Sequence, residues 1–428
     1  MRLSRARACG PCGLNHVPVP LNLLTPGAAV PVDVCNPQGQ LLLRRGELLV
    51  DDAHLQRLRA HKPCVSSVDA RAWQRAYERA VQRQLRAGAW TDLSCHDQLP
   101  ASIEAQDYAE LPTHFLKGGW LDAQEVLRVL LFHGGLAIDP LPRLRMMEER
   151  ACQWLAHDAD DSLLSLFQAL ASPTLGYSAT HALLCMAITQ LTADKLGLDA
   201  SRCHALRLAA LTMNIGIGRI QDVMAQQTSA LSAAQREQVQ ARPQISHDIL
   251  SNFGLDDPLV LDLVRWHHDP SHSQALTGNL VCRVVLHLAN VLVAKMASRQ
   301  TRSSLPPKSA ERALYLQAAA DPASTHARDV ELQVSAAMAA AVSFFPPGSY
   351  VQLNSGEVAV SVRRGAQANT PWVVPILDSS GMPYGHFTAY DTASSKYRIS
   401  QALNFEKVRV GLHLDKIRRA RDRTVTLA

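Results

Sequence analysis

The sequence predicts a mainly α-helical protein with a small β-rich module at each end. Over residues 122–341 most apolar residues recur at intervals of three and four, the spacing of one helix face. Near both ends apolar residues instead alternate by twos around turn residues. The chain has 428 residues, of which 47% are hydrophobic and 19% charged, an ordinary composition for a globular protein of two or three domains.

The first module is predicted over residues 17–90, after a disordered tail over 1–16. Two apolar runs flank the turn Asn36-Pro-Gln-Gly39, which predicts a β-hairpin. Asp51 or Asp52 can cap a helix that follows the hairpin.

A helix over 70–86 ends this module, and the polar residues 91–113 are predicted to be a linker. A helical domain over 114–342 follows. Its helices are expected over 122–132, 141–157, 162–169, 179–196, 202–212, 233–241, 245–253, 258–268, 281–297, 309–320 and 330–341.

The last module is predicted over residues 343–428. Residues 351–362 alternate by twos around Asn354-Ser-Gly356, which predicts a hairpin. The basic run from Lys416 to Arg423 is typical of a solvated chain terminus, and the net charge of +5 is mild for this length. Binding of nucleic acid is therefore not expected.

A cytoplasmic protein without a membrane span is predicted. No run of about 18 apolar residues is present, and no apolar stretch of about 7 to 15 residues follows the basic start to form a secretory signal. Nine scattered cysteines indicate reduced thiols. Cys9-Gly-Pro-Cys12 has redox or half-zinc-site spacing but lacks a second pair, so no function is assigned to it.

Candidate functional residues recur in a fixed order through the helical domain. They are His181, Ala209-Ala-Leu-Thr-Met-Asn-Ile-Gly-Ile217, Arg242-Pro-Gln-Ile-Ser246, Trp266-His-His268 and Leu288-Ala-Asn290. In this order and spacing residues 177–296 resemble the HD-GYP family, a branch of the HD superfamily of metal-dependent phosphohydrolases that cleaves cyclic di-GMP. Residues 345–360 also resemble the tail that follows the domain in some members, whereas the substituted site resembles HDOD signalling domains.

The resemblance implies an HD-type helical bundle in which histidines and carboxylates hold two or three divalent ions that activate a water molecule. Family members carry His-Asp-Ile-Gly-Lys, His-Pro-Glu-Ile-Gly, a His-His pair and Ala-Asp at these positions. The Gly-Tyr-Pro loop that names the family has no counterpart in residues 269–280 of this chain.

Three substitutions remove metal ligands that the resemblance implies. Met213 offers a soft thioether where the first histidine would bind a hard ion, and Asn214 replaces the bridging aspartate with a neutral amide. Arg242 places a permanent positive charge where a cation would be held. Two unit charges about 4 Å apart repel by roughly 4 kcal/mol at an effective dielectric constant of about 20.

Three further positions depart from the family. Asn290 replaces the last aspartate, and Tyr177 stands at the position of a glutamate that serves a third metal in some members. Ile217 replaces the lysine that would steady the scissile phosphate. No catalytic residue of the family is therefore expected intact.

His181, His267 and His268 remain as a remnant of the metal site. They are compatible with a residual Fe, Mn or Zn ion, although we expect polar core residues and no cofactor. If His267 and His268 lie on one helix, their side chains point about 100° apart and are poorly placed to share an ion.

Two other patterns give hypotheses about the same region. Arg207, Arg219 and Arg242 are hypothesised to face a former phosphate pocket and hold an anion. Four His-Asp dipeptides lack the helix-end context of the family motif, and we expect the first three to be solvated. They begin at His96, His157, His247 and His268.

The leading hypothesis is a non-catalytic regulator in bacterial signalling related to cyclic di-GMP, with other signalling proteins and a cyclic dinucleotide as candidate partners. The alternative is a metal-dependent phosphodiesterase or phosphohydrolase that uses the surviving histidines.

Overall fold

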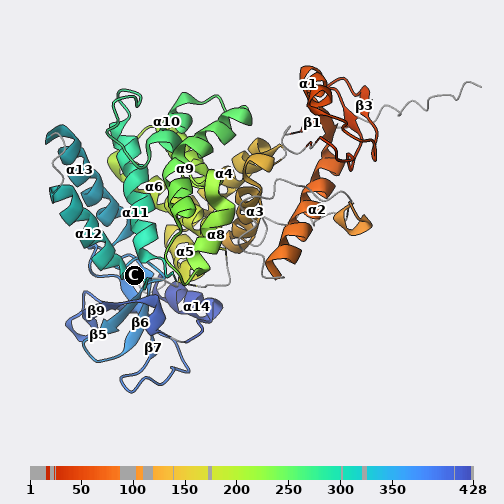
Figure 1. Ribbon diagram of the computed structural model, residues 1–428. Coiled ribbons are helices and arrows are strands. Elements are labelled where there is room, and N and C mark those ends of the chain that lie inside the picture. Colours follow the sequence, from red (N-terminus) through yellow and green to blue (C-terminus); the bar gives the residue numbers. More distant parts are fainter. Residues whose placement is uncertain are drawn as a thin grey trace, which may run out of the picture. The chain divides into compact units, whose positions relative to one another are not determined.

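The computed structural model describes residues 16–19, 24, 26–86, 103–108, 119–137, 139–171, 176–299, 302–320, 325–408 and 410–425. Within them the chain is mainly helical with one small sheet near each end, so the predicted fold class is confirmed (Figure 1). The chain forms two compact units, one of residues 1–112 with 136–139 and the other of 113–135 with 140–428. The predicted tail, Cys9-Gly-Pro-Cys12 and most of the predicted linker lie outside the described residues.

The first unit contains a four-stranded antiparallel sheet and two helices. The strands are β1 (His16–Pro18), β2 (Val34–Cys35), β3 (Leu41–Leu43) and β4 (Cys64–Ser66), in the order β1-β4-β2-β3. The helices are α1 (Asp52–Ala60) and α2 (Ser67–Arg86). The predicted hairpin is β2–β3, and Asp51 caps α1 by accepting a hydrogen bond from the His54 amide at 2.7 Å.

The second unit is built around a helical bundle. Its helices are α3 (Trp120–His133), α4 (Pro140–His157), α5 (Ala159–Ala171), α6 (Tyr177–Leu196), α7 (Ala200–Thr212), α8 (Gly218–Gln226), α9 (Ala233–Asn252), α10 (Pro258–Trp266), α11 (Leu280–Met296), α12 (Pro307–Ala320) and α13 (Thr325–Val342). Helix α6 is buried on nearly all sides, as its uniformly apolar sequence requires, and α3, α5, α7, α8, α11 and α13 pack around it. Its N-terminal turns thereby place polar side chains in the core.

Two parts of the bundle differ from the sequence prediction. Helices expected over 233–241 and 245–253 form the single helix α9, with Pro243 inside it. A proline removes one backbone donor and disfavours the helix interior, but packing of α9 against α10 and against the α7–α8 turn outweighs that cost. Helix α8 was not predicted, because Gly216 and Gly218 suggested a turn.

The C-terminal sheet packs against the helices and is not a separate unit. Its strands are β5 (Tyr350–Leu353), β6 (Val358–Arg363), β7 (Trp372–Leu377), β8 (Tyr390–Asp391) and β9 (Ile399–Leu403), in the order β8-β7-β6-β5-β9. The predicted hairpin is β5–β6, with Val351 opposite Ala359. Val360 and Val362 of β6 share one apolar core with Leu164 and Phe167 of α5. The predicted boundary at 342/343 therefore marks a change from helix to strand within one unit.

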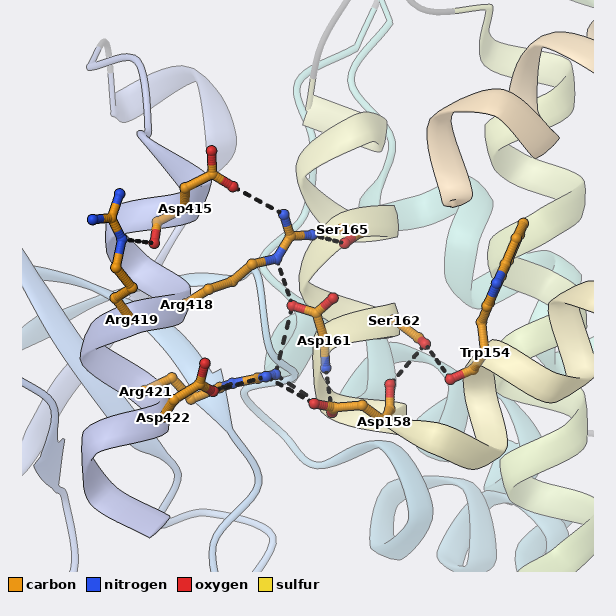
Figure 2. Close-up of polar contacts among 10 residues, drawn as sticks. All are labelled: Trp154, Asp158, Asp161, Ser162, Ser165, Asp415, Arg418, Arg419, Arg421 and Asp422. Carbon is orange, nitrogen blue, oxygen red and sulfur yellow. Dashed lines mark hydrogen bonds and ion pairs between the residues drawn. The ribbon is translucent and has the colours of Figure 1, made fainter. Parts of the chain in front are cut away.

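The basic run near the C-terminus forms the helix α14 (Leu414–Val425), which packs against β6 and β7. The prediction of a solvated run is wrong for two of its arginines. Arg421 donates to Asp158 at 2.7 Å and Arg418 donates to Asp161 at 2.8 Å, as Figure 2 shows. Ile417 of the same helix is buried. Opposite charges on α5 and an apolar face on α14 thus hold the end of the described chain against the bundle.

No helix among the described residues is both long enough and apolar enough to cross a membrane.

Candidate functional site

The motif positions lie on three helices and directly after two others. His181 is on α6, Arg242 is on α9 and Asn290 is on α11. Met213 and Asn214 follow α7, and His267 and His268 follow α10. Hydrogen bonds, ring contacts and electrostatic interactions connect five of these residues in a single cluster, which we call the motif cluster: His181, Arg242, His267, His268 and Asn290.

His181 is the buried centre of a hydrogen-bonded chain. The Arg299 guanidinium donates to the Tyr177 hydroxyl at 3.0 Å, and this hydroxyl lies 3.3 Å from His181 Nδ1. His181 Nε2 lies 2.9 Å from Asn290 Oδ1. The arrangement is satisfied when Tyr177 donates to Nδ1 and Nε2–H donates to the amide oxygen. Both imidazole nitrogens of His181 are then engaged within the protein.

The His267 and His268 rings lie closer together than expected for two residues within one helix. Helix α10 ends at Trp266 and His267 is its C-cap, so the helical angle between neighbouring side chains does not apply. The ring centroids are 4.1 Å apart. His267 Nδ1 lies 2.8 Å from the Val264 carbonyl oxygen, which assigns the proton to Nδ1 and leaves the buried Nε2 without a hydrogen bond.

Arg242 forms a hydrogen bond with His268, the other histidine of this pair. Its guanidinium NH2 donates to His268 Nε2. The lone pair that would bind a metal therefore accepts a hydrogen bond from a cation. The Nε atom of Arg242 is buried and makes no hydrogen bond.

The α7–α8 turn brings Met213 and Asn214 into the core because two glycines permit close approach. A Cβ atom on Gly216 would lie 2.8 Å from an Ile245 methyl carbon of α9, and one on Gly218 would lie 2.5 Å from the Leu131 carbonyl oxygen of α3. Both polar atoms of the Asn214 side chain are buried without a hydrogen bond. Ile217 is buried at the start of α8.

Burial and positive charge keep the cluster's histidines neutral. Burial, aided by the nearby Arg299 and Arg242 guanidinium groups and opposed by the hydrogen bond to Asn290, lowers the pKa of His181 to about 3. Burial, together with His268 and Arg242, lowers the pKa of His267 well below its usual value. The pKa of His268 is lowered by partial burial and by Arg242. Burial also lowers the pKa of Arg242 to about 10, which leaves its guanidinium protonated at neutral pH.

These donors do not fit the divalent ions that the resemblance implies. His181 uses both ring nitrogens in hydrogen bonds, and His268 Nε2 accepts from Arg242. Neutral amides stand where two carboxylates would balance the charge of the metals. Across the part of the chain that the structure describes, no three His, Cys, Asp or Glu side chains are grouped so that they could hold a metal ion.

The structure corrects the predicted set of anion-binding arginines. Arg207 pairs with Glu148, and Arg219 lies against the Phe132 ring and carbonyl group, so neither faces the motif cluster with Arg242. Arg299, which follows α11, lies there instead. No sequence signal pointed to Arg299, because it lies outside the motif positions.

A second residue that the sequence analysis missed is Asp222 of α8. Its Oδ1 accepts a hydrogen bond from the Ser178 amide at 2.6 Å, and burial raises the pKa of this carboxyl group. Gly176, the N-cap of α6, offers no side chain. Asp222 therefore caps α6 from another helix and positions the turn that carries Tyr177 and His181.

Of the His-Asp dipeptides that the structure describes, only the one that begins at His268 belongs to the motif cluster. His157 is exposed, but Asp158 pairs with Arg421 and is not simply solvated as predicted. His247 contacts its own neighbour Asp248 at 3.0 Å on α9. His96 lies outside the described residues.

No protein-family model matches the chain, and no curated protein matches it. Among solved structures the chain is similar to Bd1817, a HDG"Y"P protein from Bdellovibrio bacteriovorus, with 15% sequence identity and a TM-score of 0.37. The similarity covers 76% of this chain and 98% of that one.

Proposed function

We propose that this chain is a degenerate HD-GYP-type signalling protein that acts as a non-catalytic regulator or binding module in a pathway related to cyclic di-GMP. The observation that carries the proposal is the contact of Arg242 with His268. A guanidinium group occupies the place of a cation and uses the histidine lone pair that a metal would need.

The surrounding substitutions support the same function. With Asn214 and Asn290 in place of aspartates, no carboxylate of the motif bridges or neutralises a metal pair. Without a metal there is no activated water, and Ile217 offers no charge to the phosphate. The cluster retains donors and positive charge, which serve binding and not hydrolysis.

Metal analysis combined with an activity assay tests the proposal. The full-length protein is expressed with added Fe, Mn or Zn, purified without chelators, and assayed for metal content and for cleavage of cyclic di-GMP. We expect less than one metal ion per chain and no cleavage above the rate without protein. Stoichiometric metal together with cleavage would instead establish the alternative, a metal-dependent phosphodiesterase.

A further inference from the structure

The positive charge of the motif cluster has no acidic counterpart. Among the described residues, Arg242, Arg299 and Arg302 form no ion pair with a carboxylate. Their side chains instead donate to a histidine, a tyrosine hydroxyl and a backbone carbonyl group, respectively. Most other arginines of the second unit that contact the core have an acidic partner, as Arg283 has in Asp262 and Arg418 has in Asp161.

Unsatisfied donors lie in the same place. The Nε atoms of Arg242 and Arg299 are buried without hydrogen bonds. Buried donors of this kind cost free energy unless a partner accepts from them. Because the histidines of the cluster are neutral, the two arginines leave about two positive charges to be balanced.

The cluster is accessible from solvent. His268, which contacts Arg242, is exposed. Arg302 is also exposed and forms a pair of backbone hydrogen bonds with Arg299, each of 3.0 Å. Solvent therefore reaches the edge of the cluster at His268 and next to Arg299.

We infer that the motif cluster binds a doubly charged phosphate group through Arg242 and Arg299, without a metal. The guanidinium fork matches phosphate oxygens, and a dianion balances both charges. Each phosphodiester group of a cyclic dinucleotide carries only one negative charge. The inference therefore favours a phosphomonoester or free phosphate as the ligand, and it rests on the proposed function because a bound metal would displace Arg242.

Calorimetric titration of the full-length protein with adenosine 5′-monophosphate, inorganic phosphate, sulfate and cyclic di-GMP tests the inference. A phosphomonoester loses its second charge near pH 6, so we expect its affinity to fall about tenfold between about pH 7.5 and about pH 5. Sulfate keeps both charges in this range, and its affinity should not change. Tighter binding of adenosine monophosphate than of inorganic phosphate identifies the phosphomonoester as the source, and equal binding identifies free phosphate.

Three variants of Arg242 and Arg299, with one control variant, test where the phosphate binds. Arg242→Gln and Arg299→Gln should each weaken binding of the monophosphate at least about tenfold, because each removes one charge-assisted contact. Arg419→Gln, on the exposed face of α14, is the matched control and should bind normally. Arg299→Lys keeps the charge but loses the fork, so it should bind with intermediate affinity. Circular dichroism establishes that each variant is folded.

Two results would overturn the inference. One is the absence of binding by the monophosphate, phosphate and sulfate, and the other is tighter binding of cyclic di-GMP than of the monophosphate. Should the glutamine variants fail to fold, the contrast between monophosphate and sulfate in the unaltered protein decides the question. Metal-free, inactive protein that binds no phosphate contradicts this inference alone, whereas metal-dependent cleavage contradicts the proposed function.

Discussion

Arg242 illustrates how one side chain can replace an ion. A metal in this place would draw electron density from histidine nitrogens, whereas the guanidinium donates a hydrogen bond to His268 and keeps its own charge. It also lowers the pKa of His181 and His267, so the imidazoles stay neutral. The positive charge of the cluster thus belongs to a side chain and, unlike that of a bound metal ion, cannot be removed by a chelator.

Restoring the ligands should restore metal binding. In a variant carrying Met213→His, Asn214→Asp, Arg242→His and Asn290→Asp, two carboxylates and two imidazoles return to the positions that the resemblance assigns to metal. We expect about one tightly bound Fe or Mn ion per chain, measured by elemental analysis. Arg242→Gln alone is the control and should stay metal-free. A folded quadruple variant without metal would show that the backbone of the cluster, and not its ligands, prevents binding.

His181 should make the protein less stable in mild acid. Its pKa is about 3 when folded and about 6.5 when unfolded, so below about pH 6.5 the unfolded chain binds a proton that the folded protein does not. The stability that neutral His181 retains above about pH 6.5 is therefore lost as the pH falls toward 3. Each such histidine contributes a slope of about 1.4 kcal/mol per pH unit.

Urea unfolding at several pH values between about 5 and 7 measures this slope. His181→Gln should reduce the slope by an amount that approaches about 1.4 kcal/mol per pH unit at about pH 5 and is smaller at about pH 7, whatever its effect on stability at neutral pH. His157→Gln, at the exposed end of α4, is the control and should leave the slope of the unaltered protein. An unchanged slope in His181→Gln would mean that His181 is protonated in the folded state.

At the scale of elements, α14 and α5 are joined by charge as well as by apolar contact. Arg421 is almost buried and donates to Asp158, whose other oxygen accepts from the Asp161 amide at the start of α5 (Figure 2). Arg364, the residue after β6, pairs with Asp160 in the same turn at 2.6 Å. Carboxylates at a helix N-terminus also interact favourably with the helix dipole. This acidic turn therefore anchors both the sheet and the last described helix.

A double-mutant cycle on Arg421→Gln and Asp158→Asn should reveal this coupling. Asparagine keeps the cap of α5, so only the ion pair is lost. We expect a coupling free energy of about 1 kcal/mol in urea unfolding, near the upper end for partly exposed pairs. Arg419→Gln combined with Asp158→Asn is the control and should be additive. Additivity of the Arg421 cycle as well would leave apolar burial of Ile417 as the main force that holds α14.

Most helices could be predicted because their apolar spacing is regular, while the misses have specific causes. Pro243 suggested a break that packing overrides within α9. Strands β8 and β9 were missed because their side chains do not alternate clearly between buried and exposed. Helix α14 was predicted as a solvated run because its sequence is highly charged. The burial of Ile417 and Ala420 depends on partners that are distant in the chain and could not be predicted from this segment.

Only those residues of the motif cluster that belong to local sequence motifs could be predicted. The order of His181, Arg242 and His268 is visible in the sequence, and the structure brings these residues together. Arg299 could not be predicted, because its contact with Tyr177 spans residues from opposite ends of the bundle sequence. A contact between two such distant residues depends on tertiary packing and produces no periodic pattern in the sequence.

At the scale of the whole second unit, the C-terminal sheet is part of the helical core. Gly348, before β5, has φ +94°, and a Cβ atom there would lie 2.7 Å from Phe167 Cβ and 2.9 Å from the Leu164 carbonyl oxygen. The Gln168 side-chain amide donates to the Gly348 carbonyl oxygen at 2.7 Å. Sheet and bundle are therefore in direct backbone contact at α5, and we expect them to unfold together.

Gly348→Ala tests this contact. The positive φ costs about 1–2 kcal/mol for alanine, and the overlap with α5 adds about 1–3 kcal/mol because neither Phe167 Cβ nor a helix carbonyl group can move away. Gly381→Ala is the matched control, since Gly381 has φ +85° and no atom within 4 Å of an added Cβ. Urea unfolding should therefore show a loss for Gly348→Ala that exceeds the loss for Gly381→Ala, in one cooperative transition. Equal losses, or a separate early transition, would mean that the sheet is only loosely attached to the bundle.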